Sequence, residues 1–198
     1  MNSTSKKNYI DWSLVGELKE FLSLGHLGFE KEGLRIFDSG ISFAPHPKLL
    51  GSSLCNQFIT TDFCEAQLEL ITPPIENKHE ALNFLDDLHH FVICNIDNEI
   101  LWPFSMPPKF SSSSDIKIAD YGPSNVAMFK HTYRKGLSAR YGREMQAISG
   151  LHYNYSLPDQ VWDSSLIQKK FHDSEDKKST AYFNMIRNCY RYNWLLLY

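Results

Sequence analysis

Alternating side chains in two segments constrain the fold of this chain more than any other feature. Within residues 58–71, the apolar Ala66, Leu68 and Leu70 alternate with polar residues, which predicts a β-strand with one packed face. We expect this strand to be interrupted near Thr61–Asp62 and to end at Pro73–Pro74, because proline cannot donate to a sheet ladder. Residues 26–37 are expected to form an earlier strand. The two segments together predict a sheet.

Both strands are expected to display carboxylates in pairs. Residues two apart in a strand share a face, so Glu30 and Glu32 point the same way, as do Glu65, Gln67 and Glu69. Carboxylates on one face repel each other and resist burial unless cations neutralise them. One interpretation is an edge strand, or a half-exposed strand, whose acidic groups face solvent. The other is a site for a hard cation, which the presence of acidic pairs on both strands favours.

A third strand is expected over Met145–Leu157, and it adds complementary polar groups. Gln146, His152 and Asn154 have the same parity and would share one face. A purely structural role for His152 remains open. If the three strands are neighbours, their polar faces surround a cavity of carboxylates, amides and one imidazole. Magnesium or manganese suits such donors, whereas zinc prefers thiolates or several histidines.

Helices are expected around this sheet. Residues 14–24, with Ser13 as N-cap, and residues 80–96 both carry apolar stripes at helical spacing. A further helix over 126–141 should end at Gly142, and a last one, capped by Ser179 or Thr180, should run to Tyr198.

The helix expected over 126–141 and its end carry several basic residues. It and the residue that follows its glycine carry Lys130, His131, Arg134, Lys135, Arg140 and Arg143. A solvated helix face and a contact with polyphosphate or an acidic substrate are both consistent with this pattern. No glycine-rich phosphate loop is present in the sequence, so a nucleotide would have to be held through metals and basic side chains.

Composition excludes several classes of protein. The 198 residues are 42% hydrophobic and 22% charged, with a formal net charge of −3, which is typical of a globular protein without a general attraction to nucleic acid or membrane. The four cysteines lack metal-binding or redox spacing, so free thiols are expected. With no apolar signal sequence near the start, a cytoplasmic protein is expected. The apolar ending, Trp194–Tyr198, predicts that a covering surface is missing from the chain.

Several motifs resemble, in order, signatures of the proteobacterial-type glutamate–cysteine ligases (γ-glutamylcysteine synthetases). They are Gly28–Arg35, Thr60–Phe63, Gln67–Pro73, Leu101–Pro107, Tyr121–Gly122, Ser124–Asn125, Tyr133–Leu137, Met145–Asn154, Tyr182–Phe183 and Ile186–Asn188. The resemblance extends over nearly the whole chain, from about Gly28 to Trp194. It identifies residues 1–198 as the N-terminal part of a single catalytic domain of that family.

The resemblance implies a fold and a reaction. The fold would be α+β and glutamine-synthetase-like, with an antiparallel sheet lining a funnel-shaped active site, helices packed outside, and part of the domain missing. The reaction would be ligation of the γ-carboxylate of L-glutamate to the amine of L-cysteine through a γ-glutamyl phosphate, the first step of glutathione biosynthesis. ATP would be a substrate and Mg²⁺ or Mn²⁺ the cofactor.

The resemblance also implies roles for individual residues. Those matching the family's metal and nucleotide-phosphate positions are Glu30, Glu32, Asp62, Glu69 and His152. Those matching the wall of its cysteine pocket are Phe63, Tyr133, Leu137, Gln146 and Ile148. Glu65 shares the parity of Glu69 but is not among the matching positions.

The chain also departs from the family, whose members are considerably longer. Three hypotheses follow. The chain acts only when the rest of the active site is supplied, for example by a second chain; it is a non-catalytic remnant; or it belongs to a carboxylate–amine ligase with a different amine acceptor.

Overall fold

The structure, a computed structural model, describes residues 16, 19–164, 167–168 and 176–195. Leu27–Tyr155 form one compact unit, and the described parts of Met1–His26 and Ser156–Tyr198 form another. All the site residues expected from the sequence belong to the first unit.

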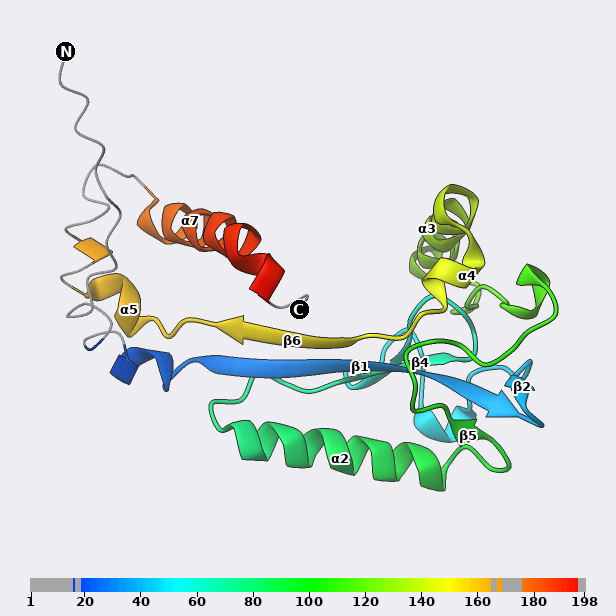
Figure 1. Cartoon of the computed structure of the whole chain (residues 1–198). Helices are drawn as coiled ribbons and strands as arrows, with labels where there is room; N and C mark the ends of the chain where they lie inside the picture. The colour runs from blue at the N-terminus through cyan, green and yellow to red at the C-terminus, as the bar shows by residue number, and fades with distance from the viewer. Residues whose placement is uncertain (1–15, 17–18, 165–166, 169–175, 196–198) are drawn as a thin grey trace, which may run out of the picture. The chain divides into compact units, whose positions relative to one another are not determined.

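A six-stranded sheet built around the long strand β1 (His26–Phe37) dominates the first unit. The other strands are β2 (Gly40–Ile41), β3 (Ile59–Thr61), β4 (Gln67–Ile71), β5 (Ile100–Leu101) and β6 (Leu151–Ser156). Strand β1 pairs antiparallel with β2, β4 and β5, and β3 pairs antiparallel with β4. Strand β6 also pairs with β1, and Figure 1 shows the two running in opposite directions. The expected α+β fold with an antiparallel sheet is confirmed; the funnel stays a prediction.

The register between β1 and β4 divides the sheet into two chemically different faces. Glu32 lies opposite Glu69 and Leu34 opposite Gln67, whereas Gly33 lies opposite Leu68. Because directly opposite residues project to the same side, the carboxylates share one face and the leucines of β4 occupy the other. The structure therefore contradicts the edge-strand interpretation of β1, since β1 has neighbours on both sides along its carboxylate-bearing half.

Helix α2 (Lys78–Cys94) covers the leucine-bearing face of the sheet. Leu68 and Leu70 pack there with Val92 of the helix, and all three are almost fully buried. Asn77 caps α2 by accepting a hydrogen bond from the backbone N–H of His79. Burying three such side chains contributes about 2 kcal/mol each, which anchors β4 and therefore Glu69.

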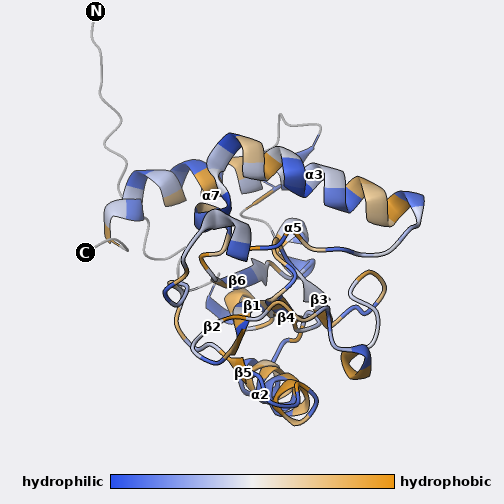
Figure 2. Cartoon of the chain, turned by 90° about the vertical axis from the view of Figure 1, so that its right-hand side faces the viewer, coloured by the Kyte–Doolittle hydropathy of each residue, from blue (hydrophilic) through white to orange (hydrophobic). Residues whose placement is uncertain are grey.

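Helix α3 (Asn125–Tyr141) lies on the opposite side of the sheet from α2, as Figures 1 and 2 show. Its Leu137 packs against a second buried cluster that includes Leu34, Phe63 and Ile116. On the carboxylate-bearing face of β1, this cluster covers the part near Leu34. Farther along β1 the same face carries Glu32 and Glu30.

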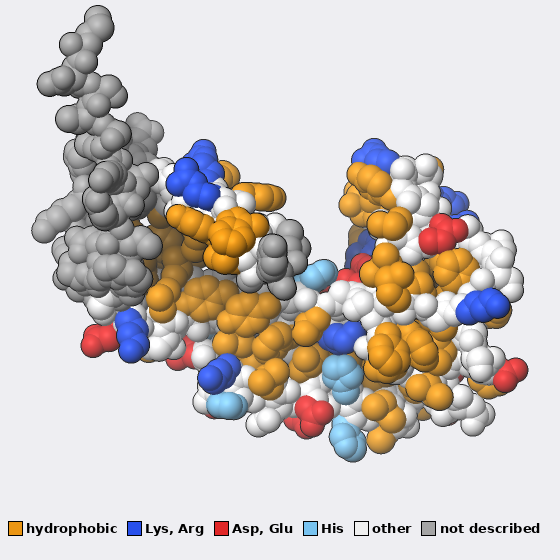
Figure 3. Space-filling view, viewed as in Figure 1, with side chains coloured by type: hydrophobic (Ala, Val, Ile, Leu, Met, Phe, Trp, Pro, Cys, Tyr) orange, Lys and Arg blue, Asp and Glu red, His pale blue; other side chains and the backbone are white. Residues whose placement is uncertain are grey.

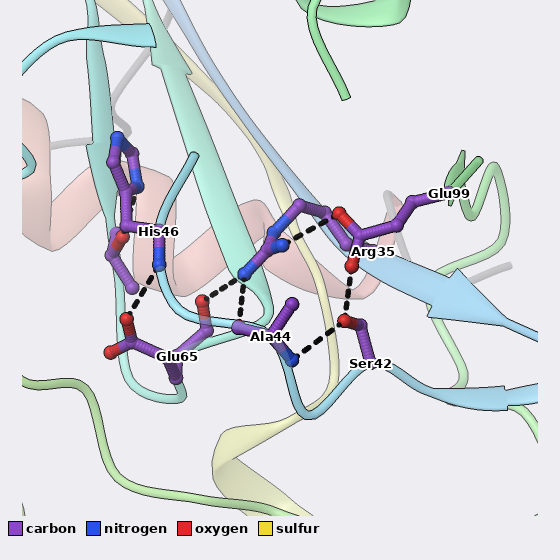
Figure 4. A network of polar contacts seen from close by, with 7 residues as sticks. Arg35, Ser42, Ala44, His46, Glu65 and Glu99 are labelled. Carbon is purple, nitrogen blue, oxygen red and sulfur yellow. Dashed lines mark hydrogen bonds and ion pairs between the residues drawn. The ribbon is translucent and has the colours of Figure 1, made fainter. Parts of the chain in front are cut away.

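A buried arginine organises the opposite end of β1 (Figure 4). Arg35 is fully buried and forms an ion pair of 2.6 Å with Glu99, while its Nη2 donates to the carbonyl oxygens of Ala44 and Glu65 at 2.9 and 3.0 Å. Glu99 also accepts a hydrogen bond from Ser42. These contacts tie three loops to one strand, so Arg35 is a structural residue rather than a binding group.

The second unit is helical in its described part. It contains α5 (Gln160–Asp163), α7 (Lys177–Tyr192) and the 3-10 turn η3 (Asn193–Leu195), with further helical residues at 16 and 19–22. The rings of Trp162 and Tyr182 lie 5.1 Å apart and join α5 to α7. Among the described residues, no helix has both the length and the apolar character needed to cross a membrane.

The strand and helix limits expected from the sequence agree with much of this structure. Strand β1 has the expected bounds, the interruption at Thr61–Asp62 separates β3 from β4, and Gly142 ends α3 with a φ of 83°. The expected cap at Ser13 lies outside the described residues. The free thiols are confirmed, since no cysteine of the chain is in a disulfide.

Three expectations were wrong. Gln146 ends the short helix α4 (Arg143–Gln146) and the strand starts only at Leu151, because the chain resumes helical geometry directly after Gly142. Glu65 lies in the β3–β4 turn, not in a strand. Helix α7 starts at Lys177 with Asp176 as its cap, because the Asp176 carboxylate accepts from the N–H of Ser179.

Candidate active site

Glu32 lies at the centre of the carboxylate-bearing face and is held from two sides. Its Oε2 accepts hydrogen bonds from the backbone N–H of Gly150 at 2.8 Å and from Nε2 of Gln67 at 3.3 Å. The side chain is 9% exposed. Two neutral donors orient this carboxylate but do not cancel its charge, so Glu32 remains available to a cation.

Glu30, one pleat away on β1, is bound by two side chains of β6. His152 Nδ1 lies 3.1 Å from its Oε2, and Asn154 Nδ2 donates to its Oε1 at 2.8 Å. His152 Nδ1 is also 3.9 Å from Glu32 Oε1. The hydrogen bond to Glu30 raises the pKa of His152, with the charges of Glu32 and Glu69 adding to the effect. The expected shared face of His152 and Asn154 is therefore confirmed, and both serve the carboxylates.

Glu69 on β4 completes an acidic pair across the strands. It lies directly opposite Glu32, a placement in which like charges destabilise a sheet. Burial, together with the charges of Asp62, Glu30 and Glu32, raises the pKa of Glu69 to about 7. Near neutral pH, a metal cation that offsets the repulsion would readily displace the proton of this carboxyl group.

Asp62 reaches the same face from the corner between β3 and β4. Burial and the charge of Glu32 raise the pKa of its carboxyl, and Arg134 opposes them. Its backbone N–H donates to the carbonyl of Gln67 at 2.9 Å, which closes the corner. Asp62 and Glu69 therefore belong to one electrostatic group with the two glutamates of β1.

The donors fit a divalent cation in chemistry but do not surround a single point. Within the described residues, no three His, Cys, Asp or Glu side chains are grouped closely enough to hold a metal ion as they stand. Carboxylates that repel one another are expected to draw together only when a cation lies between them. Oxygen donors with one imidazole suit Mg²⁺ or Mn²⁺ rather than zinc. We therefore take Glu30, Glu32, Asp62, Glu69 and His152 as a set of candidate ligands.

The residues expected to line a cysteine pocket are differently placed. Tyr133 projects from α3 and is 59% exposed, whereas Phe63 is 2% exposed and belongs to the core. Leu137 is half-buried against that core. Gln146 and Ile148, which lie in the segment between α3 and β6 along the chain, are also half-buried. Their role in binding cysteine stays a prediction.

The basic residues of α3, with Arg143 of α4, divide into structural groups and exposed ones. His131 Nδ1 lies 2.7 Å from the carbonyl oxygen of Ala119, and Arg143 donates to that of Ile116 at 3.0 Å. Arg134 donates to the carbonyl of Asp62. Lys135 and Arg140 are exposed. The sequence interpretation missed that Arg134 acts on the backbone of a candidate ligand; the only signal was its position in the basic stretch.

A cavity of about 730 Å³ lies away from the carboxylates, at the end of β1 that carries Arg35. Its described lining residues include Phe37, Ile41, Phe43 and Glu99, and none of the candidate ligands is among them. The carboxylate face is the better candidate site, because the buried Arg35 of the cavity is already paired with Glu99 whereas the carboxylates act on one another.

The model of one protein family, described as glutamate-cysteine ligase, matches residues 13–198. A glutamate–cysteine ligase of Wigglesworthia glossinidia brevipalpis is 47% identical over 191 residues, which are 96% of this chain and 37% of that protein. One from Aliivibrio salmonicida is 45% identical, over 91% of this chain and 34% of that protein.

Solved structures agree with these sequence relatives. A Francisella tularensis glutamate–cysteine ligase in complex with AMP superposes with a TM-score of 0.78 and 40% identity, covering 87% of this chain and 34% of that one. A bifunctional glutathione synthetase from Pasteurella multocida superposes with a TM-score of 0.77 and 31% identity, covering 94% of this chain and 24% of that one.

These matches define the class of protein as an α+β domain of the ligase type. The chain belongs to the glutamate–cysteine ligase family. It spans about a third of the length of the curated relatives that it matches.

Proposed function

We propose that this chain supplies the metal-binding face of an enzyme that joins the γ-carboxylate of L-glutamate to the amine of L-cysteine with ATP. The observation that carries the proposal is the electrostatic group on one face of the sheet. Four carboxylates from β1, β4 and the β3–β4 corner act on one another there, and the cationic side chains described as acting on them include His152 at Glu30 and Arg134 at Asp62. Family membership and the AMP named with the Francisella structure support a nucleotide as the group served by this face.

The proposed ligands are Glu30, Glu32, Asp62, Glu69 and His152, and Mg²⁺ or Mn²⁺ is the proposed ion. The ion would offset negative charge on the ATP phosphates during phosphoryl transfer to glutamate. Gln67 and Gly150 keep Glu32 oriented by donating to it, and Asn154 does the same for Glu30. Holding these carboxylates in advance lowers the cost of organising the site when substrates bind.

Cysteine is the proposed acceptor, with Phe63, Tyr133, Leu137, Gln146 and Ile148 as the proposed wall of its pocket. The exposed Tyr133 and half-buried Leu137 would contact the substrate, and the buried Phe63 would support them from the core. The remainder of the active site would come from polypeptide equivalent to the other two thirds of the relatives, in this chain's own continuation or in a second chain. The expectation of a cytoplasmic protein stays a prediction.

The test is a coupled assay of ADP release with Mg²⁺, ATP, glutamate and cysteine. It compares the 198-residue chain alone with the chain mixed with the remaining polypeptide of the Wigglesworthia relative. We expect cysteine-dependent ADP release from the mixture. Glu69→Gln should lower it at least about tenfold, because a ligand is lost. The matched control Glu80→Gln, at an exposed position of α2, should leave it unchanged.

Three results would count against the proposal in different ways. Release that does not depend on cysteine would indicate another amine acceptor. Release that is insensitive to Glu69→Gln would remove the carboxylate face from the reaction. No release from a mixture that forms a stable complex would favour a non-catalytic remnant.

A further inference from the structure

The hydroxyl group of Tyr121 contacts the two backbone peptide groups that flank Asp62. Its ring is buried among Ala119 and Ala127, and the residue is 8% exposed. The hydroxyl oxygen lies 2.6 Å from the carbonyl oxygen of Thr61 and 2.7 Å from that of Asp62. Its single proton is therefore shared between two consecutive carbonyl groups of the corner that carries a candidate ligand.

Arg134 of helix α3 reinforces the same corner. Its Nε donates to the Asp62 carbonyl and its Nη1 donates to the carbonyl of Lys130 at 3.1 Å. The guanidinium carbon also lies 4.8 Å from the centroid of the Tyr121 ring, and Lys130 Nζ lies 5.1 Å from it. Two cations over one buried ring fix its position, since each contact is favourable and geometrically directed.

The corner has little freedom to choose another orientation for the Asp62 side chain. The backbone N–H of Asp62 is bonded to β4 through the Gln67 carbonyl, and its own carbonyl is bonded to Tyr121 and Arg134. Because both peptide groups flanking Asp62 are held, the direction of its Cα–Cβ bond is set as well. The carboxylate is thereby kept on the face that carries Glu69.

We propose that Tyr121 is a positioning residue that presents Asp62 to the divalent cation, with its hydroxyl as the acting group. The proposal rests on the proposed function in one respect, the assignment of Asp62 as a ligand. The contacts also tie Asp62 to helix α3, which carries the proposed cysteine-pocket residues Tyr133 and Leu137. Outer contacts of this kind commonly govern metal affinity through the ligand that they orient.

The test measures Mn²⁺ binding to the 198-residue chain by the electron paramagnetic resonance signal of free Mn²⁺. Tyr121→Phe removes one hydroxyl and keeps the buried ring, and we expect it to raise the dissociation constant about tenfold. The control Tyr141→Phe removes a hydroxyl from an exposed tyrosine at the end of α3 and should bind Mn²⁺ like the unaltered chain. Circular dichroism melts establish that each variant is folded.

A double-mutant cycle separates positioning from a general structural effect. In the Asp62→Asn background, Tyr121→Phe should change the dissociation constant less than about twofold, because the hydroxyl acts through the Asp62 carboxylate. Equal losses in both backgrounds would overturn the positioning role, as would a Tyr121→Phe variant that binds Mn²⁺ like the unaltered chain. If Asp62→Asn alone leaves binding unchanged, or the unaltered chain binds no Mn²⁺, the proposed ligand set fails and the positioning role fails with it.

Discussion

Strand β1 carries Glu30 and Glu32 in one half and Arg35 in the other. The surroundings of these charged side chains differ. Arg35 is fully buried, but the chain provides Glu99 at 2.6 Å and two carbonyl oxygens to receive its donors. Glu30 and Glu32 are less completely buried and lie near two further carboxylates, and His152 Nδ1 lies 3.1 Å from Glu30 and 3.9 Å from Glu32.

The difference separates a structural group from a binding group. A buried charge that is neutralised within the chain has nothing left to offer a ligand, and removing its partner mainly affects folding. In the other half of β1, the charges of Glu30 and Glu32 help to raise the pKa of Glu69, so a cation that enters is favoured. Four experiments would break or sharpen this comparison.

The largest effect is expected from Arg35→Met. It leaves Glu99, whose side chain is only 11% exposed, without its cationic partner, and we expect a loss of about 3–5 kcal/mol in the free energy of unfolding. Urea titration followed by circular dichroism measures it, with Arg140→Met at an exposed position of α3 as control. The double variant Arg35→Met/Glu99→Gln should recover part of the loss. A loss below about 1 kcal/mol would show that the pair is not structural.

Added Mg²⁺ should stabilise the unit Leu27–Tyr155 by binding to the carboxylates of β1 and β4. At about 100 times its dissociation constant, a ligand that binds only the folded state adds about 2.7 kcal/mol to the free energy of unfolding. We expect this gain in the unaltered chain and in Glu80→Gln, and its loss in Glu69→Gln. Equal gains in all three proteins would place the ion elsewhere.

Without metal, the carboxylate face should lose stability as pH rises. The pKa of Glu69 is raised from 4.5 to about 7, so between these values the native state binds more protons than the unfolded state. The contribution of protonated Glu69 to the free energy of unfolding is complete below pH 4.5 and is lost as pH rises to about 7. After allowance for screening by solvent, this loss is about 1–2 kcal/mol. Glu69→Gln, measured in EDTA, should lack this slope. A parallel pH profile in both proteins would contradict the repulsion across β1 and β4.

At the end of β1 that carries Arg35, the free energy of unfolding should depend on pH in the opposite direction from that at the carboxylate face, and more weakly. Burial, then the charge of Arg35, lowers the pKa of His46 from 6.5 to about 4. Between these values the unfolded state binds more protons, so stability is lost as pH falls from 6.5 to about 4. About 1 kcal/mol is expected for this half-buried ring, and His46→Gln should remove the loss. A variant that keeps the full acid loss would assign it to other groups.

Local periodicity predicted much of the fold. The bounds of β1 were predicted correctly from its own residues. Gly142 was correctly placed after α3, since a residue at positive φ favours glycine. The same parity argument placed Glu30 and Glu32 together, and His152 with Asn154, before any neighbour was known.

Other features were outside the reach of that argument. Gln146 follows the parity of His152 but lies in a helix, because the parity holds only while the chain is extended. The ion pair of Arg35 with Glu99 joins residues 64 positions apart, and no local pattern links them. The Tyr121 contact with the Asp62 corner spans 59 positions in the same way.

The sequence by itself therefore determined which side chains share a face on each strand, where the principal strand lies, and which family the motifs resemble. Only the tertiary structure decided which strands are neighbours, that Glu32 faces Glu69, and which charges the chain neutralises internally. The physical reason is that side-chain parity follows from the local backbone, whereas pairing register and charge compensation depend on contacts between distant segments.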